Sequence, residues 1–539
     1  MSGTTPTSNG APPAEPLRPD KGGDDMQTLA KGGRTNTLGF FLRLLGGIPF
    51  LFVGFRLYGV DEMGRFAAAF VVIEIFALIC ALGEKRGLAR RLSEGLAEGA
   101  ADRGGDEKSA ATNLVFDGLL SSLVFSLFAC AILLIFPVII FPSGTNSDYD
   151  MWMIAAIPAF ALTEILLAAQ AYRYDIATTV RARAVVEPWT KSILVAGLFF
   201  VPALAAGGIS LAFLGAIYAA LFTAAWSFFK TYGLPKNWRP RPVELARLSW
   251  RALPLVGADV IERGTRLLDV FLLGLFTSAG TVGIYWFAKE VVSLPQKLKT
   301  SFEPILSPVI TKNLKIGNME AIANQVRQVG FWIIALQFGI ALMLAIPGEA
   351  VMGLGGPAIV GGTGALAILL AAEVIASMAV VSESVLVYIA RKRNLLISVG
   401  VITLQGALTI GLILLTRHLG YGEGFQAASA AAALFVALGV SSLVKAMVLK
   451  TLLKAPVSNW RWALVYAAAP AVVVGYGATF LPEWAEIVFG GPAILAVYLF
   501  VIWKRGFGEE DKVLFRKNVV PAPQASDSEA KPDQKSGTP

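Results

Sequence analysis

The sequence predicts an all-α polytopic membrane protein. Three observations support this fold class: the composition, the length of the apolar runs, and the placement of basic residues between them. The chain has 539 residues, of which 55% are hydrophobic and 16% are charged, and its mean hydropathy is +0.63. A soluble domain carries about 25% charged residues, so we expect this chain to sit in a membrane.

The apolar runs predict about fourteen transmembrane helices, because roughly 17–25 apolar residues cross a bilayer as one helix. Their approximate limits are 35–58, 64–83, 114–141, 151–172, 183–203, 208–229, 252–276, 281–303, 328–346, 363–390, 395–416, 425–449, 461–481 and 486–503. None of the connecting stretches is large enough to fold as an independent catalytic domain.

The loop charges predict the orientation of these helices, since cytosolic loops are enriched in lysine and arginine. If the N-terminus is cytosolic, the inner loops hold most of the basic residues, and Arg173, Arg181 and Arg183 fall in the loop before the fifth helix. The outer stretches contain no basic residue: 142–150, 205–208, 277–280 and 481–486. Both termini are therefore expected in the cytosol. This placement also accounts for the net charge of +8 without a nucleic-acid partner.

A loose internal repeat divides the helices into two groups of six. The stretch 57–68 recurs at 276–288, and in each copy a span ends, a short outer turn follows, and Gly-x-aromatic opens the next span. Gly64 and Gly283 occupy equivalent places. Six is an even number, so both halves have the same orientation and are related by a pseudo-two-fold axis along the membrane normal, an arrangement typical of transporters.

These observations predict the domain organisation. The expected parts are a disordered cytosolic tail (1–34), an N-terminal six-helix bundle (35–230), a cytosolic linker (231–251), a C-terminal six-helix bundle (252–450), an additional helix pair (451–505) and a mostly disordered cytosolic tail (506–539).

The run 254–276 is apolar enough to span the membrane, yet it contains five ionisable residues. At about 100° per residue they fall within roughly 120° of arc on one helical face. They are Asp259, Glu262, Arg263, Arg266 and Asp269. Because a charge in the bilayer centre costs at least about 2.5–3.5 kcal/mol, this face is expected to line a polar cavity between helices.

Four stretches resemble the bacterial oligosaccharide and polysaccharide flippases of the multidrug/oligosaccharidyl-lipid/polysaccharide exporter superfamily. They are 56–67, 180–188, 268–288 and 353–362. The resemblance implies two six-helix bundles with a C-terminal helix pair, located in the bacterial inner membrane. It also implies translocation of undecaprenyl-diphosphate-linked oligosaccharides, precursors of lipopolysaccharide or exopolysaccharide, from the inner to the outer leaflet. The implied partners are this lipid-linked oligosaccharide, the bilayer and other polysaccharide-assembly proteins.

Four basic residues are candidates for binding a diphosphate. Arginine forks onto phosphate oxygens and stays charged at any physiological pH. Arg43 lies in the first span, Arg263 and Arg266 in the seventh, and Lys289 near the middle of the eighth. The alternative is that Arg263 and Arg266 only neutralise acids of their own helix. Arg56, near an outer helix end, is expected to reach the lipid headgroups.

Carboxylates in the spans are candidates for coupling transport to H⁺ or Na⁺, because a buried acid can bind and release a cation. The candidates are Asp259, Glu262, Asp269, Glu290, Glu373 and Glu383. Other deep acids include Glu74, Glu164 and Glu187. The alternative for each acid is static pairing, for example of Glu187 with Lys191 at i,i+4.

Other functions remain open at this point. A multidrug/cation antiporter and a peptidoglycan-precursor flippase are rivals in the same superfamily. A membrane polymerase or glycosyltransferase of surface-polysaccharide assembly is a rival of another class, although it would need larger outer loops. The chain contains one histidine and two cysteines within apolar runs, so we expect no metal site, no cofactor and no enzymatic activity.

Overall fold

The protein folds into helices throughout the part of the chain that the structure, a computed structural model, describes. This part comprises residues 39, 41–84, 87–93, 107–142, 144–145, 147–173, 175–235, 238–299, 310–311, 313–508 and 511. All regular elements within these residues are helical, as the sequence predicts. The tails predicted for 1–34 and for most of 506–539 lie outside the described residues.

The first group of helices runs from the first span to α10. It comprises the span Phe41–Tyr58, which ends in the π-helical η1 (Gly54–Tyr58), then α2 (Val60–Cys80), α4 (Glu107–Ile135), η2 (Pro137–Ile139), α5 (Asp148–Trp152), η3 (Met153–Ala155), α6 (Ala156–Tyr172), α7 (Ile176–Val180), η4 (Arg181–Val186), α8 (Glu187–Phe199), α9 (Pro202–Ala205) and α10 (Gly208–Tyr232). Helix α10 packs on α6 and α8, and α6 packs on α2 and α4.

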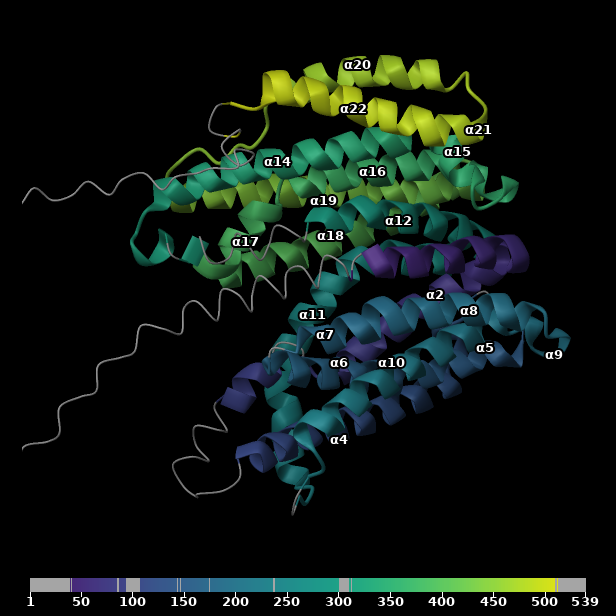
Figure 1. The fold of residues 1–539 in the computed structure, drawn as a ribbon, viewed down its shortest axis with the longest axis vertical. Coiled ribbons are helices and arrows are strands. Elements are labelled where there is room, and N and C mark those ends of the chain that lie inside the picture. The colour runs from purple at the N-terminus through teal and green to yellow at the C-terminus, as the bar shows by residue number, and fades with distance from the viewer. Residues whose placement is uncertain are drawn as a thin grey trace, which may run out of the picture.

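The second group runs from α11 to α19. It comprises α11 (Pro242–Phe276), α12 (Ala279–Lys299), α14 (Met319–Ala345), α15 (Gly348–Gly353), η6 (Pro357–Gly362), α16 (Thr363–Ser377), α17 (Val380–Ile389), α18 (Arg391–His418) and α19 (Glu423–Leu453). Helix α19 packs on α16 and α18, while α16 packs on α12 and α14. Figure 1 shows the two groups as the lower and upper parts of the molecule.

A helix pair covers the second group on its far side. It comprises α20 (Ala463–Ala478), α21 (Glu483–Ala485), η7 (Glu486–Gly490), α22 (Gly491–Val501) and η8 (Ile502–Gly506). Both α20 and α22 pack on α14, and they form the outermost layer in Figure 1. Asp511 fixes the chain beyond this pair, because it accepts hydrogen bonds from Arg461, Trp332 and Gln328.

The fourteen predicted spans all coincide with helical segments. Within the described residues, ten helices are long and apolar enough to cross a membrane by length and composition alone. The other four predicted spans correspond to α7–η4–α8, α11, α12 and α20, which are shorter or carry more charges. The predicted linker 231–251 overlaps α11, which begins earlier than expected because Pro242 suits the first turn of a helix. The remaining domain boundaries stay predictions.

The two groups meet where α2 crosses α12, at the ends of these helices that are predicted to be outer. A Cβ on Gly64 would lie 1.7 Å from the carbonyl oxygen of Ala279, and a Cβ on Gly283 would lie 2.2 Å from that of Val60. Only glycine allows two backbones to approach this closely. The contacts are reciprocal, as expected for equivalent segments about a two-fold axis, so they support the repeat that aligns Gly64 with Gly283.

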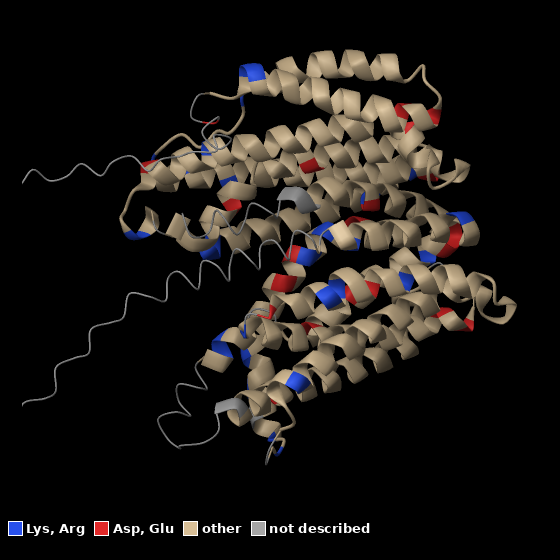
Figure 2. Ribbon diagram, in the orientation of Figure 1, with Lys and Arg blue, Asp and Glu red and all other residues tan. Residues whose placement is uncertain are grey.

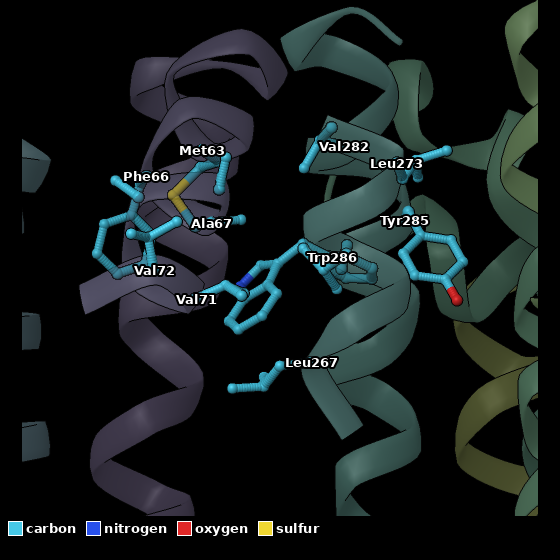
Figure 3. Packing of buried hydrophobic residues seen from close by; sticks show 14 of the residues in the cluster. Met63, Phe66, Ala67, Val71, Val72, Leu267, Leu273, Val282, Tyr285 and Trp286 are labelled. Atoms are coloured by element: carbon cyan, nitrogen blue, oxygen red, sulfur yellow. The ribbon is translucent and has the colours of Figure 1, made fainter. Parts of the chain in front are cut away.

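Side chains reinforce this crossing. Figure 3 shows Met63, Phe66 and Val71 on α2 beside Val282 and Trp286 on α12, with Val71 and Trp286 directed toward one another. All five side chains are buried in one hydrophobic cluster. Nearby, Arg56 donates a hydrogen bond to the carbonyl oxygen of Leu354, at 3.2 Å, which links the first span to the second group. Arg56 is exposed, and the expectation that it reaches the lipid headgroups stays a prediction.

Candidate functional site

A cavity of about 1560 Å³ lies between the two groups of helices. Its wall draws on the first span, α2 and α8 of the first group and on α11, α12, α16, α17, α18 and α19 of the second. It extends from Lys392, at the predicted inner end of α18, to Leu354, near the predicted outer side. Figure 2 shows basic and acidic residues interspersed in this middle region, whereas α20 and α22 carry them mainly at their ends.

All four basic residues predicted to bind a diphosphate line this cavity: Arg43, Arg263, Arg266 and Lys289. The side chains of Arg263 and Arg266 are 43% and 38% exposed, so part of each guanidinium is open to the cavity. Arg43 is also exposed. The structure thus brings together residues from the first, seventh and eighth spans that lie far apart in the sequence.

Arg263 and Arg266 form ion pairs with acids of other helices. An Nη atom of Arg263 lies 2.5 Å from Oε1 of Glu74 on α2, so this pair joins the two groups. An Nη atom of Arg266 lies 3.7 Å from Oε1 of Glu373 on α16. These ion pairs connect α11 to its neighbours, so the two arginines do more than neutralise the acids of their own helix.

Lys289 is held by Asp269, one of the acids that the sequence predicts for coupling. Its Nζ forms an ion pair with Asp269, whose side chain is fully buried. Asp269 also accepts a hydrogen bond from the Tyr285 hydroxyl at 2.7 Å. Neither Asp269 nor Asp259 lines the cavity; both are buried behind its wall. The coupling role of these two acids stays a prediction.

The other four candidate acids line the cavity directly: Glu262, Glu290, Glu373 and Glu383. Glu373 accepts a hydrogen bond from Gln296 at 2.6 Å in addition to its contact with Arg266. Glu383 pairs at 3.0 Å with Lys445 of α19, whose side chain is 7% exposed. Sequence reasoning missed Lys445, although a lysine inside an apolar run is the same signal that identified Lys289.

A second charged cluster lies in the first group and corrects two expectations. Arg183 was expected in an inner loop, but it lies in η4 and lines the cavity. Its guanidinium contacts Glu164 at 2.5 Å and Glu187 at 2.7 Å and lies over the ring of Phe160. The loop assignment failed because the helix already begins at Ile176. Glu187 therefore pairs with Arg183, and Lys191 lies instead over the ring of Phe50, at 4.2 Å.

The arrangement suits the reversible binding of an anion. Five basic residues of the wall hold a carboxylate partner, and Arg43 forms no ion pair with any described residue, so it presents its charge to the cavity. The oxygens of an incoming anion can replace the protein's own carboxylates as partners of these basic residues, so the basic residues keep a charge-assisted hydrogen bond. Among the described residues, no group of three or more metal-ligating side chains gathers in one place.

A helical protein with many membrane passes and a charged cavity between two groups of helices has the architecture of a membrane transporter. The sequence places it more narrowly. The family described as "Polysaccharide biosynthesis protein" matches residues 35–314, more than half of the chain, and the protein belongs to this family. No curated protein sequence gives a significant match.

Solved structures with the same fold are flippases and transporters. An inward closed conformation of the lipid II flippase MurJ matches with a TM-score of 0.66 at 13% identity, over 88% of this chain and 99% of that one. An inward-facing multidrug resistance MATE transporter of the MOP superfamily matches with a TM-score of 0.61 at 16% identity, over 77% and 94%. The outward-facing MATE conformation gives 0.53 at 15% identity, over 79% and 96%. At these identities the likeness concerns the fold.

Proposed function

We propose that this protein is a flippase that moves an undecaprenyl-diphosphate-linked oligosaccharide from the inner to the outer leaflet of the bacterial inner membrane. The observation that carries the proposal is the cavity between the two groups, into which Arg43, Arg263 and Arg266 project from two different spans. Guanidinium groups that converge in this way suit the oxygens of a diphosphate. The family description is consistent with a precursor of lipopolysaccharide or exopolysaccharide as the cargo.

The mechanism that fits this geometry is alternating access. The two groups touch at the predicted outer crossing of α2 and α12 and again where α11 packs on α2, and the cavity lies between them. The headgroup enters the cavity, its diphosphate takes the place of Glu74 and Glu373 at the two arginines, and the groups then rock to open outward. No covalent bond forms or breaks, so the protein acts as a transporter and not as an enzyme. Both termini are proposed to lie in the cytosol.

Coupling to H⁺ or Na⁺ is part of the proposal. The cavity acids, Glu262, Glu290, Glu373 and Glu383, are placed to take up a cation as the diphosphate leaves. Each elementary charge that crosses the membrane gains roughly 2.3 kcal/mol per 100 mV. The same four carboxylates also favour a second candidate function, export of cationic drugs, because an acidic wall binds cations.

The test is a deletion strain complemented with Arg43→Ala, Arg263→Ala or Arg266→Ala. Loss of one charge-assisted contact is expected to lower the transport rate by about tenfold or more, so lipid-linked oligosaccharide accumulates. Arg505→Ala is the matched control, because Arg505 is exposed at the predicted inner end and lies outside the cavity.

Two outcomes would contradict this function. Full complementation by all three cavity variants, at wild-type protein levels, would exclude the arginines as the diphosphate site. Unchanged surface polysaccharide together with altered drug tolerance in the deletion strain would favour the drug exporter. Accumulation of a peptidoglycan precursor instead would change the cargo while keeping the flippase reaction.

A further inference from the structure

Six aromatic side chains line the cavity toward the crossing of α2 and α12. They are Phe50, Phe52, Phe66, Phe70, Trp286 and Phe287. Two pairs of these rings are in contact across the boundary between the two groups. The ring centroids of Phe70 and Trp286 are 5.5 Å apart and those of Phe52 and Phe287 are 6.2 Å apart, and both pairs are edge to face. The charged residues lie in the remaining part of the wall among aliphatic residues, so the cavity has an aromatic end and a middle that carries the charges.

Trp286 is the tryptophan among these six residues, and its indole N–H has no partner within the described part of the chain. The side chain is only 6% exposed and projects from α12 toward α2, as Figure 3 shows. Its indole N–H donates a hydrogen bond to none of the described residues. Other tryptophans do find acceptors: Trp189 donates to the carbonyl oxygen of Leu42, and Trp238 donates to Asp117. A buried indole usually has such a partner. Because Trp286 lines the cavity, its N–H is available to a molecule that enters there.

Charged groups lie one helical turn from this ring. Lys289 and Glu290 follow Trp286 at i+3 and i+4 on α12, which places them on the same side of the helix, and both line the cavity. A sugar ring has an apolar face of C–H groups and a rim of hydroxyls. An aromatic face, an unused N–H donor and a nearby carboxylate acceptor match these two features.

We propose that Trp286 and Phe70 form a stacking site for a sugar residue of the transported headgroup. The indole N–H donates to a sugar oxygen, and Glu290 accepts a hydrogen bond from a sugar hydroxyl. The diphosphate then lies at Arg266 and Arg263, toward the predicted inner end, with the sugar directed to the aromatic end. The inference rests on the proposed flippase function and adds to it a subsite that recognises a sugar residue of the cargo.

The position of the rings indicates when this site is complete. Trp286 lies one turn beyond Gly283 and Phe70 about two turns beyond Gly64, so the ring pair lies directly inside the backbone crossing of α2 and α12. Separation of these helices during outward opening parts the two rings and uncovers their faces. The sugar then replaces the contact that each ring loses, which lowers the cost of opening when a headgroup is present and not otherwise.

Binding measurements with two probes test the proposal. The full-length protein in lipid nanodiscs is titrated with undecaprenyl diphosphate and with undecaprenyl-diphosphate-linked N-acetylglucosamine. Trp286→Ala is expected to weaken binding of the sugar-bearing probe about tenfold and to leave that of the sugar-free probe unchanged. Trp286→Phe keeps a ring but loses the N–H donor, so a loss of about threefold is expected for the sugar-bearing probe alone.

Phe213→Leu is the matched control. Phe213 is as deeply buried, lies 5.7 Å from Phe70 and 5.5 Å from Phe66, and does not line the cavity. This variant measures the effect of disturbing the packing around Phe66 and Phe70. Its affinities for the sugar-bearing and the sugar-free probe are both expected to equal those of the wild type. If Trp286→Ala fails to fold, Trp286→Phe still decides the question.

Three results would overturn the proposal. An equal loss for both probes in the Trp286 variants would assign Trp286 to packing. Wild-type protein that binds both probes equally, with no change in either variant, would show that no sugar is read here while leaving the flippase function standing. Wild-type protein that binds neither probe would refute the flippase function itself, and the sugar site with it.

Discussion

The two ends of the boundary between the helix groups are held by different kinds of contact. At the predicted outer end, α2 and α12 touch backbone to backbone, with Gly64 and Gly283 leaving no room for a side chain. Farther inside, the groups face each other across a cavity, and α11 reaches α2 both by packing near Gly83 and through the ion pair between Arg263 and Glu74.

The difference has a mechanical meaning. A backbone crossing fits in one geometry and is lost when the helices shift by an ångström or two, because close-packed contacts are not continuously deformable. An ion pair facing a wet cavity can exchange its partner and tolerate motion. In the proposed flippase cycle, the crossing would therefore define the state that is closed to the outer side, whereas the ion pairs of the cavity would respond to the bound cargo.

The largest effect is expected where an ion pair lies wholly inside one group. Arg183→Ala leaves Glu164 and Glu187 without their shared partner, with each side chain only 18% exposed. Removal of one member of a buried ion pair costs about 3–5 kcal/mol, so the variant is expected to melt at a markedly lower temperature. The triple change Arg183→Met, Glu164→Gln and Glu187→Gln should restore much of this loss. An Arg183→Ala protein as stable as wild type would mean that an ion pair within one group contributes no more to stability than the other ion pairs of the cavity.

The next largest effect concerns the crossing itself. Gly64→Ala or Gly283→Ala places a methyl group within 2.2 Å of a carbonyl oxygen, so α2 and α12 must separate. We expect a loss of about 2–3 kcal/mol in stability of the closed state, seen as a lower melting temperature and impaired complementation.

Gly411→Ala provides the control for that experiment. Gly411 lies inside α18, and a Cβ there would meet nothing within 4 Å. Its melting temperature should stay constant or rise slightly, since alanine favours a helix over glycine. Equal behaviour of Gly64→Ala and Gly411→Ala would remove the distinction between the two ends of the boundary.

A smaller effect is expected at the ion pair that joins the groups. Arg263 is 43% exposed, so its bond to Glu74 contributes modestly to stability. A double-mutant cycle with Arg263→Gln and Glu74→Gln is expected to give a coupling energy of about 1 kcal/mol. A value above that for the Arg183 cluster would reverse the roles assigned to the two pairs.

An effect of similar size lies outside the boundary and depends on pH. Burial opposes ionisation of Asp511, but hydrogen bonds from Arg461, the Gly508 N–H and Gln328 outweigh it and lower the pKa of this carboxyl. Its contribution is therefore complete above the pKa of an unfolded aspartate, about 3.9, and disappears as the pH falls through the lower folded value. Asp511→Asn should lower the melting temperature at pH 7 by an amount that corresponds to about 1 kcal/mol. This difference should shrink only below about pH 4; a difference that shrinks between pH 6 and 8 would contradict the assignment.

Much of the fold could be predicted from the sequence because membrane burial leaves a simple signal. Each of the fourteen predicted apolar runs coincides with a helical segment of the described residues, and the repeat aligned Gly64 with Gly283, which the structure places in reciprocal contact. The charges of α11 correctly indicated a polar cavity, since charged residues in a span must face polar surroundings.

The partners of those charges could not be predicted. Periodicity shows which residues share a face of one helix, but it does not show which helix lies opposite. The pairs of Arg263 with Glu74 and of Lys445 with Glu383 join residues far apart in the chain and depend on tertiary packing. Arg183 was misplaced because a run of small and basic residues reads as a loop, whereas the structure continues it as a π-helical turn.

The attachment of α20 and α22 has a practical consequence for spectroscopy. Because this pair packs on α14, a fluorophore placed on it travels with the second group, and Phe480, which is 76% exposed, offers a site between the two helices. Phe200, 78% exposed, offers the counterpart on the first group. The native thiols are Cys80, which is buried, and Cys130, which is half-buried. Energy transfer between dyes at residues 200 and 480 would therefore act as a ruler across the predicted outer face, and it should fall each time that face opens.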